Sequence, residues 1–173
     1  MTKYLILGHG GHGKGSVASI MQGMGITCIS SSVAALHTVI FPQMRDRYKT
    51  PAECYHDRRN RRREWLSLIT DYNTPDAGRL CREMLSQYDC YDGMRPLREY
   101  EATSHLFDVI LYVDASDRCP SDQTMEIPFD ASSMMLIDNN GSESDLIKRI
   151  TKCRLIKDCS SSQRHDKLSI STL

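Results

Sequence analysis

The sequence has no excess charge of either sign and no long apolar run. Lys plus Arg and Asp plus Glu each number 22 among 173 residues, so the formal net charge is zero. This balance argues against a protein that coats nucleic acid through bulk charge, although it permits a local basic groove. No apolar run approaches the roughly 18 residues needed to cross a bilayer, and no signal peptide precedes the first apolar segment. We therefore expect no membrane partner.

Cys-x-x-Cys pairs are also lacking. The seven cysteines are odd in number, and their spacing suits neither a disulfide framework nor a zinc site. Reduced thiols in a cytoplasmic protein are the better interpretation. The sequence also lacks the Asn/Thr-Lys-x-Asp segment that reads guanine in GTPases, which disfavours that class.

Short apolar strands alternate with helical patterns along most of the chain. This alternation predicts an α/β fold in three layers, with helices on both faces of a mainly parallel sheet. Strands are expected at 3–7, 26–29, 88–92, 108–113 and 134–137. Helices are expected at 14–24, 33–41, 51–69, 76–85, 96–106 and 142–150, with Pro42 ending the second of them. We expect one domain over 1–153, an irregular connection at 115–133 and a flexible Ser-rich tail at 154–173.

A glycine-rich segment lies between the first predicted strand and the first predicted helix. It reads Gly8-His9-Gly10-Gly11-His12-Gly13-Lys14-Gly15-Ser16 and fits the phosphate-loop pattern, except that the hydroxyl follows the lysine by two positions. Glycines let backbone N–H groups turn inward around phosphate oxygens, and the following helix adds its positive end. Lys14 is expected to reach the β- and γ-phosphates, and Ser16 to lie near Mg²⁺. The segment predicts a nucleoside triphosphate site; the alternative is a flexible turn in which His9 and His12 only fill the loop.

Ligands of parallel sheets bind at the carboxyl ends of the strands, where further candidate residues follow predicted strands. Asp92 is expected to order Mg²⁺, unless it is a turn aspartate that ends its strand. Arg95 can neutralise charge on a transferring group, although Arg95 and Glu99 also fit an ordinary helix-surface pair. Arg118 and Asn140 are candidates to contact ATP, with a surface arginine and a turn as the alternatives.

Five arginines fall within the six residues 58–63 and form the strongest charge cluster of the chain. Guanidinium groups suit bidentate contacts with phosphates, so we predict that Arg58, Arg61, Arg62 and Arg63 hold the acceptor of a reaction. The alternative is a solvated helix face. Trp65 is expected in the core rather than as a platform for a stacked base.

At these residues the chain resembles phage deoxynucleotide-kinase-like proteins of the phosphate-loop kinase superfamily, over about residues 3 to 150. The placement of Ser16 is similar to the Gly-Lys-Asp-Thr form of that family's loop. Asp92-Gly93-Met94-Arg95, followed by Glu99, resembles its Asp-x-Arg…Glu segment, which implies a place for Glu99 at the acceptor. Asp138-Asn139-Asn140-Gly141-Ser142 resembles the Asn-Asp-Gly-Ser segment that precedes its final helix.

Within that superfamily, one branch is the most similar. Residues 93–95, 99, 106–108 and 113–116 look like those of phage kinases that act on 5-hydroxymethyluracil within DNA. The resemblance implies phosphorylation of the base's hydroxymethyl group, an early step in thymidine hypermodification, in the cytoplasm of an infected bacterial cell. No Lys or Arg occurs between Arg118 and Lys148, so an arginine-bearing lid over ATP is lacking and a polymer acceptor is favoured.

Together these features predict a phosphate-loop kinase that uses ATP and Mg²⁺. Lys14, Asp92 and Arg95 are the predicted catalytic residues, and Ser16 and Asp92 the predicted metal ligands. DNA carrying a modified pyrimidine is the predicted acceptor. Two other functions stay open: a kinase of free deoxynucleoside monophosphates, and a nucleotide-binding module that transfers nothing.

Overall fold

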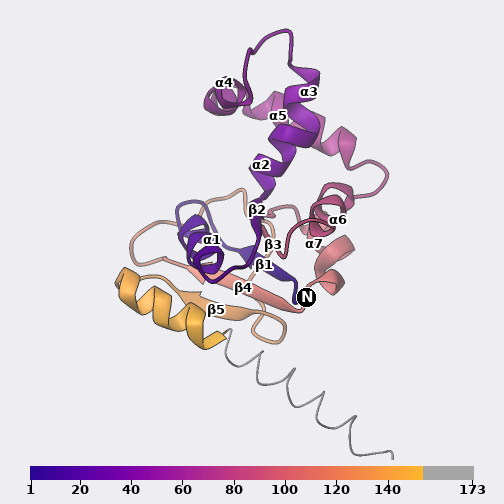
Figure 1. Ribbon diagram of the computed structural model, residues 1–173. Coiled ribbons are helices and arrows are strands. Elements are labelled where there is room, and N and C mark those ends of the chain that lie inside the picture. The colour runs from indigo at the N-terminus through magenta and orange to yellow at the C-terminus, as the bar shows by residue number, and fades with distance from the viewer. Residues whose placement is uncertain (154–173) are drawn as a thin grey trace, which may run out of the picture.

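Five parallel strands form one sheet in the order β2-β3-β1-β4-β5 (Figure 1). The computed structural model describes residues 1–153, and the predicted tail 154–173 lies outside the described residues. The strands are β1 (Tyr4–Leu7), β2 (Cys28–Ser30), β3 (Cys90–Asp92), β4 (Val109–Asp114) and β5 (Met135–Asp138). The predicted α/β class with a parallel sheet is therefore confirmed, and each predicted strand is found within two residues of its expected start.

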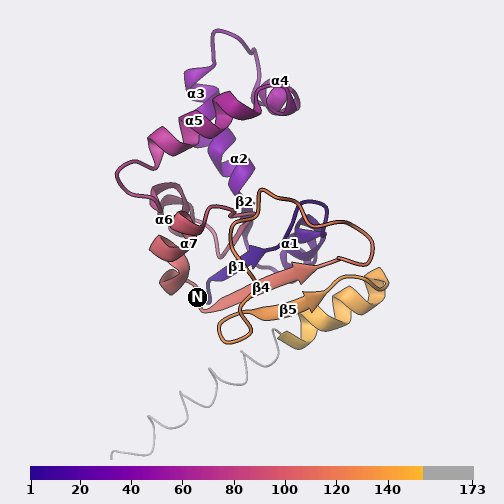
Figure 2. The ribbon, with the colours of Figure 1, turned by 180° about the vertical axis from the view of Figure 1, so that it is seen from behind.

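Helices cover both faces of this sheet (Figures 1 and 2). Alternate residues of β1 enter two different cores, because successive side chains of a strand point to opposite faces. Tyr4 and Ile6 pack with apolar residues of α1 (Lys14–Gly23) and of the helix at 143–153. Leu5 and Leu7 pack with those of α6 (Arg79–Leu85). The sheet is thus the middle of three layers.

A helical arm, residues 31–72, is inserted between β2 and β3 and extends away from the sheet (Figures 1 and 2). Its elements are α2 (Ser31–Ala35), the π-helical turn η1 (Leu36–Ile40), α3 (Phe41–Gln43), α4 (Pro51–His56), the 3-10 turn η2 (Asp57–Arg59) and α5 (Arg62–Tyr72). Buried Trp65 belongs to the same apolar core as Leu5 and Leu7, so one continuous core extends from the sheet into the arm. The prediction that Trp65 lies in the core is confirmed.

Two predicted helices of the arm have the wrong bounds. Pro42 does not end the helix before it, because the turn at Leu36–Ile40 is π-helical and the Met44 N–H still donates to the Ile40 carbonyl at 3.0 Å. The predicted helix 51–69 is broken after His56. There the Asp57 carboxylate accepts a hydrogen bond from the Asn60 side chain at 2.7 Å and closes a tight turn.

The remaining elements lie between β3 and β5. α7 (Leu97–Thr103) and the 3-10 turn η3 (Ser104–Leu106) follow β3, close to the predicted helix 96–106. The connection at 115–133 contains no helix or strand, as predicted. Within residues 1–153, no helix combines the length and the apolar composition required to cross a membrane.

A glycine at the start of α1 gives the first test of this structure. Gly13 has a φ of 91°, and a Cβ added there would collide with the Asn139 side chain. Replacing Gly13 with Ala should therefore lower the free energy of unfolding by about 3 kcal/mol. Gly15→Ala is the matched control, because nothing lies within 4 Å of a Cβ at that position. Urea unfolding without nucleotide measures both variants, and equal losses would contradict the described loop.

Candidate functional site

The glycine-rich loop connects β1 to α1 at the carboxyl edge of the sheet. Gly8 has a φ of 136° and approaches the Val113 carbonyl of β4 so closely that a Cβ would not fit. Gly11 has a φ of 81°, and a Cβ there would lie 2.6 Å from the Cys119 sulfur. Gly8 and Gly11 are therefore needed because larger residues would collide with the chain segments that lie against the loop.

The side chain of His12 fixes the loop to the connection after β4. It is fully buried, and the Ala115 N–H donates to its Nδ1 at 3.1 Å. The ring proton is accordingly assigned to Nε2, which lies 3.0 Å from the Cys119 carbonyl and donates to it. Both ring nitrogens are thus engaged, so His12 presents only its backbone to the loop interior.

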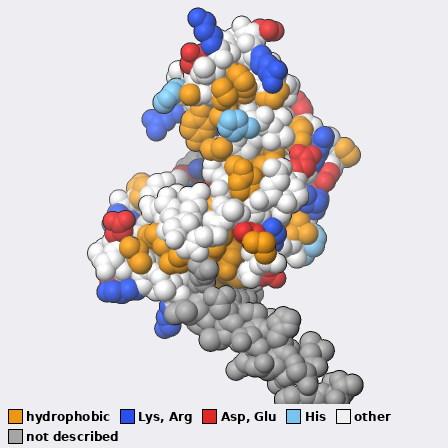
Figure 3. Space-filling view, viewed as in Figure 1, with side chains coloured by type: hydrophobic (Ala, Val, Ile, Leu, Met, Phe, Trp, Pro, Cys, Tyr) orange, Lys and Arg blue, Asp and Glu red, His pale blue; other side chains and the backbone are white. Residues whose placement is uncertain are grey.

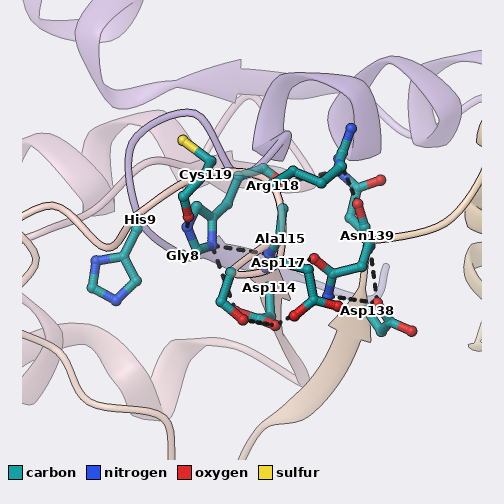
Figure 4. A network of polar contacts seen from close by, with 12 residues as sticks. Gly8, His9, Asp114, Ala115, Asp117, Arg118, Cys119, Asp138 and Asn139 are labelled. Carbon is teal, nitrogen blue, oxygen red and sulfur yellow. Dashed lines mark hydrogen bonds and ion pairs between the residues drawn. The ribbon is translucent and has the colours of Figure 1, made fainter.

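The ends of β4 and β5 form a polar network beside the loop (Figure 4). The Asn139 side chain donates to the His12 carbonyl at 2.9 Å, and Arg118 reaches across to donate to the Asn139 carbonyl. Asn140 accepts from the Asp117 N–H at 3.0 Å. The predicted residues Arg118 and Asn140 therefore lie at the same edge of the sheet as the loop. Their side chains form hydrogen bonds between the connection after β4 and the connection after β5.

Lys14 lies with its ammonium group inside the loop. Its Nζ donates to the carbonyls of Gly8 and His9, both at 2.8 Å. Burial lowers the pKa of Lys14 and the nearby Arg95 adds to this effect, whereas two carboxylates described below oppose it. A cation is thus held at the position where the sequence predicts contact with phosphates.

Asp92 ends β3 beside the loop, in register with Ile6 of β1. Burial raises the pKa of the Asp92 carboxyl, and the charge of Lys14 opposes that shift. Ser16 is exposed in the first turn of α1. In the part of the chain that the structure describes, neither the Asp92 carboxylate nor the Ser16 hydroxyl has a hydrogen-bond partner, so both retain oxygen atoms that suit Mg²⁺.

A dedicated metal cage is not formed by the side chains of residues 1–153. No group of three or more His, Cys, Asp and Glu residues gathers there in a way that could hold a metal ion. Mg²⁺ commonly keeps several waters and takes only one or two protein ligands together with substrate phosphates. The donors that Ser16 and Asp92 offer fit that mode of binding.

Asp122 is a member of this site that the sequence did not reveal. Its carboxylate accepts from the Gly10 N–H at 2.6 Å and from the Thr124 N–H at 2.7 Å, and it forms an ion pair with Arg95 at 3.0 Å. Burial alone would raise the pKa of Asp122, but the hydrogen bonds from Thr124 and Gly10 and the charge of Arg95 hold it well below its usual range. Because the connection at 115–133 has no periodic pattern, no signal marked this aspartate.

Glu99 lies inside the protein rather than on the surface of α7. Glu99 is only 8% exposed, and its Oε1 has no hydrogen-bond partner among residues 1–153. Burial raises the pKa of Glu99 to about 7, with a hydrogen bond from Tyr91 opposing the shift. The contact with an acceptor that the sequence predicts would require Glu99 to leave this position.

The arginine-rich segment 58–63 lies at the corner between η2 and α5 rather than on one continuous helix. The guanidinium of Arg58 stacks 5.7 Å from the centre of the Tyr55 ring, and Arg61 pairs with Asp57 at 3.3 Å. These two arginines are thus engaged with their neighbours on the arm. The exposed residues Arg59, Arg62 and Arg63 form no ion pair with any described residue.

A cavity of about 510 Å³ adjoins this segment on the arm. Its walls are mostly apolar and come from α2, η1 and α4, including Val33, Leu36, His37, Pro51 and Tyr55. Figure 3 shows hydrophobic side chains gathered on the arm. Tyr55 also carries the stacked Arg58, so one residue of the arginine-rich segment lies beside the cavity.

The fold and the loop together define the class: an α/β protein with a phosphate-loop-like connection between its first strand and first helix. No protein-family model and no curated protein matches the chain. Among solved structures, it is similar to an unliganded sugar kinase from Janibacter sp. HTCC2649, with 14% identity and a TM-score of 0.43 over 86% of this chain and 92% of that one.

The buried Glu99 predicts a pH-dependent stability. Because the pKa of Glu99 is raised from 4.5 to about 7 on folding, its contribution is complete below pH 4.5 and is lost as the pH rises through 7, by about 3 kcal/mol at most. Glu99→Gln should therefore gain stability over the wild type as the pH rises from 4.5 to 8. Glu101→Gln, exposed on the same helix, should not. Thermal melts across this pH range measure both variants. The same pH dependence for Glu99→Gln and Glu101→Gln would contradict the buried position of Glu99.

Proposed function

We propose that the chain is an ATP-dependent kinase that phosphorylates the hydroxymethyl group of 5-hydroxymethyluracil in DNA. The observation that supports phosphoryl transfer most strongly is the Lys14 ammonium inside the glycine loop, with Asp92 and Arg95 beside it. A loop of this kind, at the positive end of a helix, is suited to phosphate groups. Lys14 and Arg95 add side-chain positive charge, which stabilises the negative charge of the transferring phosphoryl group.

In this reaction the hydroxymethyl oxygen attacks the γ-phosphorus of ATP and forms a new P–O bond. The bond from that phosphorus to the bridging oxygen breaks, ADP leaves, and the hydroxyl loses its proton. Asp92 is the proposed group that orients the hydroxyl or accepts this proton, because its carboxylate lies at the end of β3 beside the loop. Catalysis otherwise depends on positioning and on electrostatic stabilisation.

Mg²⁺ is the proposed companion of ATP. Ser16 and Asp92 would hold it, because their side-chain oxygens lack other partners among the described residues. When bound, the ion supplies positive charge to the phosphate oxygens. The protein would contribute two oxygen ligands beside the loop, one from Ser16 and one from Asp92.

The arm supports a base within DNA as the acceptor. Arg59, Arg62 and Arg63 leave three guanidinium groups exposed, which suits contacts with successive phosphates. The adjoining cavity has mostly apolar walls and an aromatic ring from Tyr55, which suits a base of the same DNA other than the one that reacts. The connection after β4 offers no cation beyond Arg118 to close over a small substrate.

One transfer experiment separates the candidate functions. The protein is incubated with labelled ATP and Mg²⁺ and, in separate reactions, with a duplex containing 5-hydroxymethyluracil, an unmodified duplex and a panel of deoxynucleoside monophosphates. We expect label only in the modified duplex. Label in a monophosphate would replace this proposal with a free-nucleotide kinase, and ATP binding without transfer to any acceptor would favour a binding module.

Lys14 is the residue whose loss should affect transfer most. Lys14→Ala is expected to lower the rate by at least about 100-fold, because it removes a charge that stabilises the transferring group. Lys148→Ala is the control, since that side chain is exposed on the helix at 143–153. Initial rates measure the effect, with melting temperatures to show that both variants fold. A rate above a tenth of the wild-type rate would contradict the role of Lys14.

The exposed arginines of the arm should govern the affinity for DNA. Replacing Arg59, Arg62 and Arg63 with Ala is expected to weaken duplex binding and to reduce the slope of log K against log salt by about one per lost phosphate contact. Arg98→Ala, exposed on α7, is the control. Fluorescence anisotropy at several salt concentrations measures both quantities. An unchanged slope would mean that the segment is only a solvated surface.

A further inference from the structure

The carboxylate of Asp122 lies where positive groups of the loop and of the neighbouring strand end converge. Its Oδ2 is 2.6 Å from the Gly10 nitrogen and 3.0 Å from Nη1 of Arg95, and its other oxygen is 3.2 Å from the same Nη1. Thr124 donates to that second oxygen through its N–H at 2.7 Å. A loop N–H and an arginine are also the donors that proteins commonly offer to phosphate oxygens.

The approach of Asp122 to the loop depends on the glycine that it contacts. A Cβ added at Gly10 would lie 2.5 Å from Oδ2 and 3.5 Å from the Arg95 guanidinium. Gly10 therefore leaves room for an anion between its own N–H and Arg95. The Asp122 carboxylate fills that room.

Residues 119–126, which we call the clasp, carry Asp122 across the loop. On one side His9 contacts the Asp122 carbonyl through Nδ1 at 3.1 Å, and the Cys119 thiol lies 3.6 Å from the Gly10 carbonyl. On the other side the Glu126 N–H donates to the Arg95 carbonyl at 3.1 Å. The clasp thus bridges the phosphate loop and the segment after β3.

The clasp is a surface segment between two buried anchors. Ala115 and Ile127 are buried at its flanks, whereas Pro120, Ser121 and Gln123 are exposed. Met125 packs against the apolar core, whereas no large apolar side chain of residues 119–124 enters it. Polar contacts with the loop and Arg95 therefore hold Asp122, and contacts of this kind can exchange with those of a ligand.

We propose that Asp122 is an internal substitute for the terminal phosphate of the nucleotide. A polyphosphate that enters the loop brings negative charge against the Asp122 carboxylate, and the two repel each other. The phosphate takes over the Gly10 N–H and Arg95, while the carboxylate moves outward with residues 119–124 of the clasp. This inference rests on the proposed function only in requiring that the loop binds a polyphosphate.

The test compares nucleotide binding by Asp122→Asn and by the wild type. The amide keeps the size of the side chain and removes its charge, so competition with phosphate weakens. We expect ATP with Mg²⁺ to bind about tenfold more tightly to Asp122→Asn by calorimetry, and the gain for AMP to be smaller. Asp117→Asn is the control, because it removes the same charge from the same connection without a side-chain contact to the loop. Its affinity should match that of the wild type.

A second variant guards against misfolding of the first. Thr124→Ala removes a hydroxyl bonded to Asp122 at 2.5 Å and should strengthen ATP binding in the same direction but by less. Weaker or unchanged ATP binding by both variants, with wild-type melting temperatures, would overturn the inference, and so would a failure of all forms to bind ATP. Tight binding without transfer would instead overturn the proposed kinase activity and leave the role of Asp122 intact.

Discussion

The hydrogen bonds of one buried histidine hold the candidate site together. His12 accepts from the Ala115 N–H and donates to the Cys119 carbonyl, and its own carbonyl accepts from Asn139. The loop is thereby tied to the ends of β4 and β5, and Val113 of β4 lies so close that only glycine fits at Gly8. A buried polar group without its partners costs free energy, so these three contacts favour a single loop conformation. The direction in which the loop presents its N–H groups follows from that conformation.

Charges of both signs lie close together around the loop. Lys14 and Arg95 lie near Asp92 and Asp122. The two carboxylates raise the pKa of Lys14, and the charge of Lys14 lowers the pKa of Asp92. Groups with perturbed pKa values, as Lys14, Asp92 and Asp122 have here, cluster at functional sites. In this account, nucleotide binding replaces one anion of the cluster with another, and Arg95 becomes available to the transferring group.

Much of the central fold could be predicted because its signals are local. The apolar run at β1, the glycines and the amphipathic α1 each carry their own pattern, and Asp92 and Arg95 follow a strand that a parallel sheet must bring to the same edge. Long-range contacts explain what was missed. The break after His56 depends on the side chain of Asp57, the burial of Glu99 on packing against Tyr91, and the place of Asp122 on a connection without periodicity.

Locating a bound nucleotide decides whether the glycine loop binds the phosphates of ATP. A crystal structure with Mg²⁺ and a non-hydrolysable ATP analogue should place the phosphates against the N–H groups of the loop. Lys14 should have left the Gly8 and His9 carbonyls for the phosphate oxygens. An analogue bound elsewhere on the protein, with Lys14 still bonded to both carbonyls, would contradict the account.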